Sequence, residues 1–370
     1  MMNTELTLLG KNILTVGAGN IGYLTSYQLT QAGARVKAII EATGREGGFP
    51  VQANRVRRLG IPLLLNHMIL EAIPNEAGDG IKAAVIARAE NFKPVEGTEK
   101  LIDGIDAINI CTGLMPDDAL LEKGREMFGL HCYGAGDAIR IGEGTSAVLR
   151  GKQVAYEILA NMQASYSYDD FLSVSKEYID SQQHPVKVIE EPFMPSAERR
   201  AKPFVLIDCT YGFACNPCAF ACKYGAITKS STSTVPLIDF EKCVGCMDCV
   251  YQCPGLAIFG YNLPKGIFFL PIEFDMNEGE EVFLVDNHAN ILGEGLIQRV
   301  LRKPNKTHVA RVKAHEGMDT EKMLQVRGFI LKSAHQPALE LKPRAEQPES
   351  GFYMCHCDDV RFEDVLAVIG

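Results

Sequence analysis

The sequence predicts a mixed α/β protein with three structured regions. Near the N-terminus an apolar strand runs into a glycine-rich turn and then into a helical segment. Eight of the twelve cysteines stand in two regular runs between Cys209 and Cys253, and short apolar runs separated by turn residues follow from about residue 265. These patterns are typical of a Rossmann-like dinucleotide-binding domain, a cysteine-rich α+β module and a small β-rich domain, in that order.

Composition indicates the broad class of protein. The chain has 370 residues, of which 46% are hydrophobic and 22% charged, which is ordinary for a globular protein of two or three domains. The net charge of -9 argues against nucleic acid as a partner, because phosphate neutralisation needs a basic face. Neither a signal-peptide pattern nor an apolar run long enough for a transmembrane segment is found, so we expect a cytoplasmic protein. In that compartment, twelve cysteines indicate metal or redox chemistry before disulfides.

The expected domain boundaries follow from these patterns and from prolines that punctuate an extended linker. They are 1–160 for the nucleotide-binding domain, 161–203 for the linker, 204–264 for the cysteine-rich module, 265–335 for the β-rich domain and 350–370 for a final cysteine-containing segment. Within the linker, residues 168–178 favour a short helix. A basic run within 299–313 is best explained as a solvated strand face, with docking of an acidic electron carrier or a partner subunit as the alternative.

The first motif, Gly17-Ala-Gly19-Asn-Ile-Gly22, follows the apolar strand 11–16. Gly17 permits a sharp turn, Gly19 lets the backbone approach a pyrophosphate, and Gly22 allows a helix to pack closely on the strand. The phosphates would lie at the N-terminus of that helix, which we expect over 23–32. The candidate nucleotide-binding residues of this turn are Gly17, Gly19, Asn20, Ile21 and Gly22.

A second apolar strand, 35–41, ends in Glu41, at the position where an acid binds ribose hydroxyls. Glu41 favours an unphosphorylated ribose, as in NAD, FAD or another adenine nucleotide. NADP is the alternative, because four arginines follow, namely Arg45, Arg55, Arg57 and Arg58. Residues 53–60 are more simply explained as a solvated helix face. A Rossmann-like fold that binds no ligand is the other alternative.

Further strands are expected over 61–65, 81–87 and 105–111. The last of them ends in a Thr112-Gly113 turn, and a later strand runs into Gly136-Asp137 before a helix over 144–159. This arrangement resembles the closing segment of the FAD domain in flavoproteins with two dinucleotide-binding folds. The resemblance implies that Asp137 contacts the ribityl and pyrophosphate part of FAD; the alternative is that Asp137 is the N-cap of the helix. The candidate FAD-site residues are Thr112, Gly113, Gly136 and Asp137.

The order of these motifs leads to a closer resemblance. In that flavoprotein family an FAD glycine motif comes first, a NAD-type motif lies mid-chain, and the Gly-Asp segment closes the FAD domain; residues 1–10 here contain no earlier glycine turn. Residues 10–160 are most similar to the iron–sulfur flavoprotein subunits of amine and amino-acid dehydrogenases, the group of the larger chains of sarcosine oxidase, opine oxidase and dye-linked proline dehydrogenase. The resemblance implies an FAD shared with a partner subunit that supplies the first half of its site, unless the single motif binds FAD itself.

The first cysteine run comprises Cys209, Cys215, Cys218 and Cys222, and the second comprises Cys243, Cys246, Cys249 and Cys253. The second run has the C-x2-C-x2-C-x3-C-P spacing of a [4Fe-4S] ligand loop. Two residues between thiolates aim three sulfurs at one cluster, while the fourth cysteine, at the start of the next turn, points to a neighbouring cluster. We therefore expect crossed ligation of two [4Fe-4S] clusters, in which Cys222 joins the first three cysteines of the second run and Cys253 joins the first three of the first run.

Both runs end alike, since Ala-Ile follows each fourth cysteine at the same distance, as in an internal repeat. About fifty residues here resemble the bacterial ferredoxins with two [4Fe-4S] clusters. Five residues separate Cys209 from Cys215 where that family has two, and Lys223 replaces the usual proline. The longer loop leaves open whether Cys209 is a ligand, and two structural zinc sites are the alternative to clusters.

The final segment holds Cys355 and Cys357, one residue apart and just before an expected helix. It resembles the opening of the small [2Fe-2S] domain found in the same amino-acid dehydrogenases and in bacterioferritin-associated ferredoxin. That family has a second cysteine pair downstream, and none follows before Gly370. A [2Fe-2S] cluster therefore needs a second pair from another chain or from further sequence; otherwise the two thiols bind nothing.

Together these motifs favour an electron-transfer subunit, with FAD and two [4Fe-4S] clusters, of a multi-subunit dehydrogenase that oxidises an amine or amino acid such as proline, hydroxyproline, sarcosine or an opine. A partner chain would oxidise the substrate, and a soluble acceptor would receive the electrons. The alternatives are an NAD(P)H-dependent oxidoreductase module of the glutamate-synthase small-chain type and a non-enzymatic assembly scaffold with a structural nucleotide. No catalytic acid or base can be named, and Cys111 and Cys132 are expected to be buried thiols on apolar strands.

Overall fold

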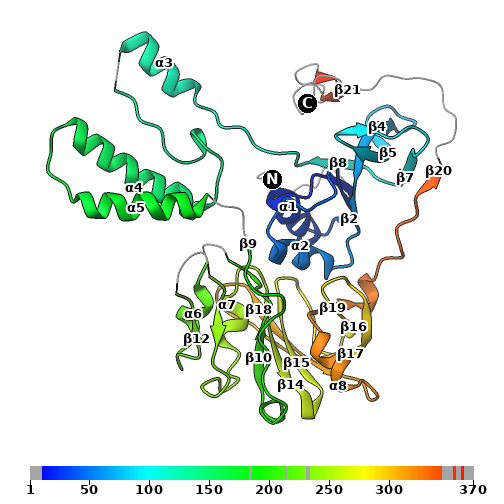
Figure 1. Cartoon of the computed structure of the whole chain (residues 1–370). Helices are drawn as coiled ribbons and strands as arrows, with labels where there is room; N and C mark the ends of the chain where they lie inside the picture. Colours follow the sequence, from blue (N-terminus) through cyan, green and yellow to red (C-terminus); the bar gives the residue numbers. More distant parts are fainter. Residues whose placement is uncertain are drawn as a thin grey trace. The chain divides into compact units, whose positions relative to one another are not determined.

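The computed structural model describes residues 11–129, 131–182, 188–212, 215–230 and 234–343, and the backbone of 186–187, 353–355 and 360–361 (Figure 1). Helices and strands alternate at the start of the chain and strands predominate after the cysteine runs, so the expected mixed α/β class is confirmed. The chain divides into two compact units. Unit 1 comprises Met1–Gly113, Ser196–Leu206 and Gly245–Gly370, and unit 2 comprises Leu114–Pro195 and Ile207–Val244. This division passes through the second cysteine run.

Unit 1 begins with a four-stranded parallel sheet in the order β3-β2-β1-β8. Its strands are β1 Asn12–Val16, β2 Arg35–Glu41, β3 Leu63–Leu65 and β8 Ala107–Ile110. Helix α1 (Asn20–Gln31) follows β1, and helix α2 (Pro50–Arg57) follows β2. Tyr23 and Tyr27 of α1 pack with Val56 of α2 against Val36 and Ile39 of β2, so both helices cover one face of the sheet. The strand, turn, helix and second strand expected from the sequence are all present, within a few residues.

An antiparallel meander covers the opposite face of that sheet (Figure 1). It consists of β4 His67–Pro74, β5 Ile81–Glu90, β6 Lys93–Pro94 and β7 Lys100–Asp103, with β20 Lys342–Pro343 added at its edge. Ala84, Ile86 and Ile102 of the meander pack against Leu14 and Ile40 of the parallel sheet. From the sequence, only a short strand at 81–87 was expected in this part of the chain, and β4 was not. Strand β4 was missed because its register on β5 shifts twice, which breaks the alternation of apolar residues.

A seven-stranded sheet, in the order β10-β14-β15-β18-β17-β16-β19, accounts for most of the later part of unit 1. Its strands are β10 Phe204–Ile207, β14 Ile258–Asn262, β15 Ile267–Ile272, β16 Glu281–Val285, β17 Ile291–Leu301, β18 His308–Ala314 and β19 Gly328–Leu331. Shorter elements are α7 Asp248–Gln252, α8 Thr320–Gln325, the 3-10 turns η2 Arg199–Ala201, η3 Leu263–Lys265 and η4 Lys332–Ala334, and the paired strands β21 Tyr353–Cys355 and β22 Val360–Arg361. Strand β10 precedes the cysteine-rich segment in the sequence and β14 follows it, and the two strands pair with each other in this sheet.

Unit 2 is built mainly from helices. They are α3 Ala119–Phe128, α4 Gly144–Asn161, α5 Tyr168–Ser181 and α6 Pro217–Ala221, accompanied by the 3-10 turn η1 Gly136–Ala138 and the short strands β9 Val186–Lys187, β11 Tyr211–Gly212, β12 Ile227–Thr228 and β13 Leu237–Ile238. The expected helices over 144–159 and 168–178 are thus present as α4 and α5. The strand expected to run into Gly136 is absent from the described residues 131–135. Gly136 adopts a φ of +65°, which an extended strand does not permit.

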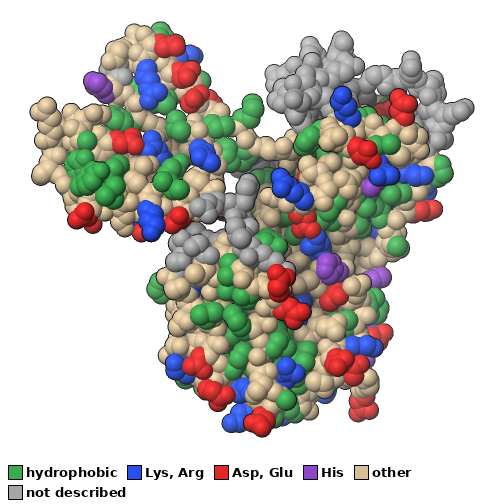
Figure 2. Space-filling model, viewed as in Figure 1, with side chains coloured by type: hydrophobic (Ala, Val, Ile, Leu, Met, Phe, Trp, Pro, Cys, Tyr) green, Lys and Arg blue, Asp and Glu red, His purple; other side chains and the backbone are tan. Residues whose placement is uncertain are grey.

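The described surface carries charges of both signs. On the face shown in Figure 2, lysine and arginine side chains are interspersed with aspartate and glutamate, so the net charge of -9 is not gathered in one patch there. Within the described parts of the chain, every helix is too short or too polar to span a bilayer.

Candidate functional site

The glycine turn of unit 1 meets three different steric demands. Gly17 has a φ of +106°, and a Cβ there would lie 2.2 Å from the carbonyl O of Cys111. A Cβ at Gly22 would lie 2.0 Å from the carbonyl O of Gly17, whereas one at Gly19 would meet no atom within 4 Å. Two of the glycines therefore allow strand β1, helix α1 and the end of β8 to pack closely, and the third leaves open space beside the backbone. This is the arrangement that a pyrophosphate needs.

The start of helix α1 lies at this open position. Gly19 is its N-cap and provides no side-chain cap, so the positive end of the helix dipole meets the space beside Gly19. The Asn20 side chain accepts a hydrogen bond from the N–H of Phe49 at 2.7 Å, and the N–H of Gly47 donates to the carbonyl O of Ala18 at 3.0 Å. Residues 42–49 thus fold back onto the glycine turn.

Glu41 joins the glycine turn to this loop. One of its carboxylate oxygens accepts from the N–H of Ala18 at 2.8 Å, and the other accepts from the N–H and the hydroxyl of Thr43, both at 3.0 Å. A carboxylate has about four acceptor positions, so capacity for one more donor remains. Glu41 lies at the carboxyl end of β2, which is the position expected of a ribose-binding acid.

Residues 53–60 were expected to form a solvated helix face, and this expectation is wrong for two of the three arginines there. Arg55 and Arg58 are only 9% and 7% exposed. Arg55 stacks on the ring of Tyr27 at 3.5 Å and forms an ion pair with Glu273. Ion pairs and hydrogen bonds to distant residues allow guanidinium groups to be buried in this way, although the Nε of Arg55 has no hydrogen-bond partner among the described residues. Amphipathic patterning does not reveal such distant partners. Arg57 forms an ion pair with Glu46 in the loop over the glycine turn.

The candidate residues at the end of β8 lie in unit 1. Thr112 and Gly113 follow the strand, and Gly113 has a φ of +133°. Cys111 lies just beyond β8 and is half-buried, so the expectation of a buried thiol on a strand is not met. Its Sγ lies 3.5 Å from the Thr25 hydroxyl of helix α1.

The other candidate FAD residues lie in unit 2. Asp137 is exposed in the turn η1, and its carboxylate accepts from the N–H of Gly142 at 3.2 Å. Glu143 is the N-cap of helix α4, so the alternative in which Asp137 caps that helix is wrong. Cys132 is half-buried and lies outside any strand, again unlike the expectation.

The first cysteine run lies in unit 2. The five-residue helix α6 contains the buried Cys218 and ends at Cys222, which adopts an extended conformation. The N–H of Ala226 donates to the Sγ of Cys222 at 3.2 Å. Lys229 donates to the carbonyl O of Cys215 at 2.8 Å. Lys229 was not predicted to belong to the site, since nothing in the local sequence pattern distinguishes it from a surface lysine.

The second run repeats this geometry. The five-residue helix α7 contains the buried Cys249 and ends at Cys253, also in an extended conformation, and the N–H of Ala257 donates to the Sγ of Cys253 at 3.4 Å. Burial raises the pKa of the Cys253 thiol, while the N–H groups of Ala257 and Gly255 and the charges of Arg58 and Arg55 act in the opposite direction. The internal repeat expected from the sequence therefore extends to a matching hydrogen bond, four residues after each fourth cysteine.

These cysteines suit an iron–sulfur cluster. Thiolates are the ligands of [4Fe-4S] clusters, and N–H groups directed at sulfur are among the interactions that stabilise them. Cys243 belongs to unit 2 and Cys246, Cys249 and Cys253 to unit 1, so each crossed ligand set draws on both units and stays a prediction. Cys355 ends strand β21, but its side chain, like the whole of Cys357, lies outside the described residues, and the [2Fe-2S] assignment also stays a prediction.

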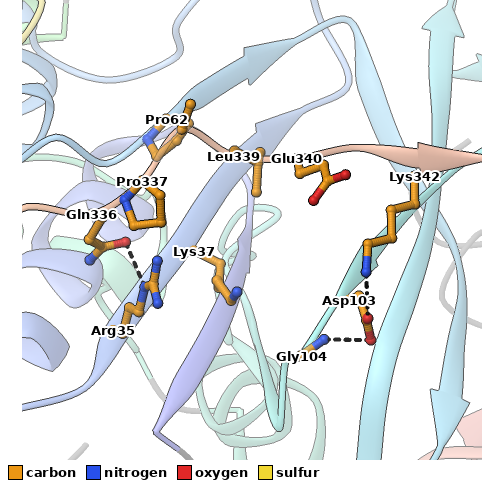
Figure 3. Close-up of a pocket in the computed structure, with 11 residues that line it drawn as sticks. Arg35, Lys37, Pro62, Asp103, Gly104, Gln336, Pro337, Leu339, Glu340 and Lys342 are labelled. Carbon is orange, nitrogen blue, oxygen red and sulfur yellow. Dashed lines mark hydrogen bonds and ion pairs between the residues drawn. The ribbon is translucent and has the colours of Figure 1, made fainter.

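A separate pocket of about 350 Å³ in unit 1 holds none of the expected site residues (Figure 3). It lies at the start of β2, the opposite end of that strand from Glu41. Arg35 donates to Gln336 at 2.9 Å, and Lys342 pairs with Asp103 at 3.1 Å. The segment 336–342 lines one side of the pocket, and the sequence does not reveal the pocket because this segment is far from β2 along the chain.

One exposed group of side chains could reach a shared cation among the described residues. Glu281, Glu294 and His315 place their ligand atoms within 4.8 Å of one another. Lys332 already lies 2.6 Å from Glu294 and 3.6 Å from Glu281, and its hydrogen bond to Glu294 raises the pKa of Lys332. The ammonium of Lys332 thus provides the positive charge beside Glu281 and Glu294.

Comparison with known proteins supports the cysteine site. Residues 234–255 match the family model of a 4Fe-4S binding domain, so this segment is of the [4Fe-4S]-binding class. A curated relative, one subunit of the selenate reductase of Mesobacillus selenatarsenatis, is 28% identical over 141 residues, which are 35% of this chain and 42% of the relative. The chain therefore spans less than half the length of that relative.

Solved structures show a weaker similarity. Thioredoxin reductase of T. acidophilum is 20% identical, with 30% of this chain and 34% of that chain covered at a TM-score of 0.25. Thioredoxin reductase of Giardia duodenalis is 13% identical, with 33% and 37% covered at a TM-score of 0.26. TM-scores this low do not establish a shared fold.

Proposed function

We propose that this chain is an electron-transfer subunit of a multi-subunit iron–sulfur flavoenzyme. The observation that carries the proposal is the repeated cysteine geometry. In each run a five-residue helix is followed directly by its C-cap cysteine, Cys222 or Cys253, and an N–H four residues later donates to that sulfur. The match of residues 234–255 to 4Fe-4S binding domains supports it. The selenate reductase relative is itself one subunit of its enzyme, which supports a multi-subunit assembly.

The proposed ligands form two crossed sets. One set is Cys209, Cys215, Cys218 and Cys253, and the other is Cys222, Cys243, Cys246 and Cys249. A [4Fe-4S] cluster supplies a one-electron carrier whose potential depends on net charge, hydrogen bonds to sulfur and exposure. The chain contributes the thiolates, the sulfur-directed N–H groups and the charged side chains around them.

The proposed nucleotide site consists of Gly17, Gly19, Asn20, Ile21, Gly22 and Glu41. The open space at Gly19 and the helix N-terminus suit a pyrophosphate, and Glu41 suits ribose hydroxyls. Arg55 and Arg57 are engaged with Glu273 and Glu46, which supports an unphosphorylated ribose over NADP. FAD is the proposed occupant, and Thr112, Gly113, Gly136 and Asp137 are the proposed residues of the flavin side of that site.

The proposed substrate class is an amine or amino acid of the proline, hydroxyproline, sarcosine or opine type, by resemblance to the dehydrogenases named above. Oxidation of such an amine to an imine removes two electrons and two protons from the substrate. The electrons would leave the substrate as a pair on a partner subunit and reach a soluble carrier one at a time through the two cysteine sets. The absence of a nameable acid or base in the described residues is consistent with substrate oxidation on that partner.

A second candidate function is an NAD(P)H-dependent oxidoreductase module that feeds electrons into clusters. The glycine turn with Glu41 is the observation that favours it, because this geometry suits a nicotinamide dinucleotide as well as FAD.

Cofactor analysis of the anaerobically purified chain tests both proposals. Iron, sulfide, FAD, FMN and adenine nucleotides are measured per chain, with and without co-expressed partner subunits. About eight irons in the chain alone, with FAD bound only beside a partner, are expected for the electron-transfer subunit. A chain that binds FAD alone and is bleached by NADH would instead establish the second function, and a zinc-loaded chain without iron would contradict both.

A further inference from the structure

A half-buried lysine lies against the first cysteine run. The Lys229 ammonium donates to the carbonyl O of Cys215 at 2.8 Å and is half-buried. Burial lowers the pKa of Lys229, and the thiols of Cys209, Cys215 and Cys218 act in the opposite direction. This positive charge therefore lies close to three proposed ligands of one set.

Two buried arginines lie against the end of the second run. Arg58 donates to the carbonyl O of Leu256 at 2.9 Å, and Arg55 donates to that of Pro254 at 3.4 Å. Both carbonyls belong to the turn directly after Cys253, which is the fourth ligand of the same set. The two arginines are 7% and 9% exposed, so water and salt screen their charges little.

We propose that Lys229, Arg58 and Arg55 raise the reduction potential of one particular cluster above that of the other. The ligands of this cluster are Cys209, Cys215, Cys218 and Cys253. The inference rests on the proposed function, because it requires clusters bound in crossed sets. Reduction adds one negative charge to a cluster, and a nearby cation that is buried or half-buried stabilises that charge. An incoming electron therefore resides first on this cluster.

The lysines beside the other set have different surroundings. Lys242, directly before Cys243, pairs with Asp239 at 3.1 Å. Lys223, directly after Cys222, is exposed. A paired surface charge and an exposed one each contribute little to the local potential, because water and salt screen them.

Arg199 is half-buried and donates to the carbonyl O of Pro203, which lies against Gly245 of the second run. The two sets thus differ chiefly in the two buried arginines beside Cys253, which is why two separate potentials are expected.

A redox titration of the wild-type chain is the first test. Iron and sulfide are counted, and the chain is then titrated anaerobically with dithionite while EPR follows the reduced clusters. Two signals with resolved midpoint potentials are expected. A chain without clusters contradicts the proposed function itself. Two clusters that share one midpoint leave the proposed function standing and overturn this inference.

Single-charge variants identify the cations. Lys229→Met and Arg58→Met each remove a charge and keep an apolar stem. Each variant is expected to lower only the higher of the two midpoint potentials. At a fixed potential, the ratio of reduced to oxidised cluster should fall about tenfold, which corresponds to a shift of the midpoint potential of about 59 mV for one electron. Arg55→Met is expected to act less strongly, because Glu273 offsets its charge.

Two matched controls remove a positive charge nearby. Arg57→Met alters a neighbour on the same helix that pairs with Glu46, and Lys242→Met alters the lysine paired with Asp239. Neither midpoint should move in these controls.

The pattern of shifts decides the proposal. Lys229→Met and Arg58→Met acting on different midpoints would show uncrossed ligation and overturn it, as would the absence of any shift. If a methionine variant loses its iron, the charge-retaining variants Lys229→Arg and Arg58→Lys are measured instead. Both midpoint potentials are then expected to stay near the wild-type values. If the higher of the two potentials falls although the charge is retained, the residue has a structural role and not an electrostatic one.

Discussion

Cys209 stands six positions before Cys215, yet its thiol lies close enough to Lys229 to act on that ammonium together with Cys215 and Cys218. The longer loop therefore leaves Cys209 within electrostatic range of the same lysine as Cys215 and Cys218. Its proposed role as a ligand is consistent with this placement.

Replacing single cysteines tests that role. Cys209→Ala is expected to reduce the iron content from about eight toward about four per chain, because one cluster loses a ligand. Cys132→Ala is the control and should retain all of the iron, since Cys132 belongs to neither run. Iron and sulfide assays on anaerobically purified variants provide the measurement. Full iron content in Cys209→Ala would indicate a different fourth ligand.

The glycines of the nucleotide turn should respond differently to alanine. Gly22→Ala places a Cβ against a backbone carbonyl and is expected to destabilise unit 1 by about 3 kcal/mol or more. Gly19→Ala meets open space and should change stability by less than about 1 kcal/mol. The same Cβ occupies the approach of a pyrophosphate, so the affinity for ADP should fall about tenfold or more. Thermal unfolding and calorimetric titration with ADP measure the two effects. Unchanged ADP affinity in Gly19→Ala would place the nucleotide elsewhere.

Tyr27 makes the stability of unit 1 depend on alkaline pH. Burial raises its pKa to about 12 from the ordinary value of 10.0, although the nearby Arg55 acts in the opposite direction. A folded-state pKa above the unfolded value means that the contribution is complete below pH 10 and is lost as the pH rises from about 10 to about 12. The loss amounts to about 3 kcal/mol. Tyr27→Phe keeps the ring under Arg55 and should remove this dependence. Parallel curves of unfolding free energy against pH for the two proteins would refute the prediction.

At the scale of elements, the segment from Gln336 to Pro343 links the late part of unit 1 to its first sheets. Leu339 and Leu341 pack against the core shared by the parallel sheet and the meander. Strand β20 pairs with β7, and Lys342 pairs with Asp103 (Figure 3).

Truncation of this segment's apolar side chains should weaken that core. Leu339→Ala is expected to lower the free energy of unfolding by about 1–2 kcal/mol, because the side chain is partly rather than fully buried. Leu120→Ala, at a leucine that is 85% exposed on α3, is the control and should change little. Denaturant titrations of the wild type and the two variants measure the free energies of unfolding. Equal effects in both variants would mean that the segment does not contribute to the core.

Helix α2 has two different surroundings along its length. Its buried Ala53 and Val56 pack against the helical face of the parallel sheet, as a helix in a Rossmann-like fold should. Its arginines instead reach outside that fold, to Glu273 and to the turn after Cys253. A helix that the sequence assigns to the nucleotide-binding domain therefore also supports the second cysteine run.

At the scale of the molecule, the two units differ in how much apolar core they contain. The first sheets of unit 1 have two cores of buried aliphatic and tyrosine side chains, neither of which includes a cysteine. Among the described residues of the segment from Ile207 to Val244 in unit 2, few apolar side chains are buried, including Cys218, Ala226 and Val235. Metal binding replaces hydrophobic burial in such segments.

Iron removal should therefore affect the two units unequally. Treatment with ferricyanide and EDTA is expected to expose the segment from Ile207 to Val244 to trypsin, with cuts at Lys223 and Lys242, while residues 11–113 resist. The untreated protein is the control and should resist at both places. If trypsin cleaves both regions at the same rate, or cleaves neither, the prediction is contradicted. Mass spectrometry of the fragments provides the measurement.

The sequence alone determined the features that depend on neighbouring residues. The strand, glycine turn and helix at Gly17 to Gly22 follow from local sterics, and so does the spacing of the cysteine runs, because loop length fixes which thiols can share a metal. Helices α4 and α5 were likewise predictable, since their signals lie within their own residues.

The tertiary structure decided what distant residues contribute. The burial of Arg55 and Arg58 depends on Glu273 and Leu256, about two hundred positions away, and no periodicity signals such partners. Lys229 resembles any surface lysine until the fold brings it to Cys215. Charges act through space rather than along the chain, so the cations beside each cysteine run appear only once the chain has folded.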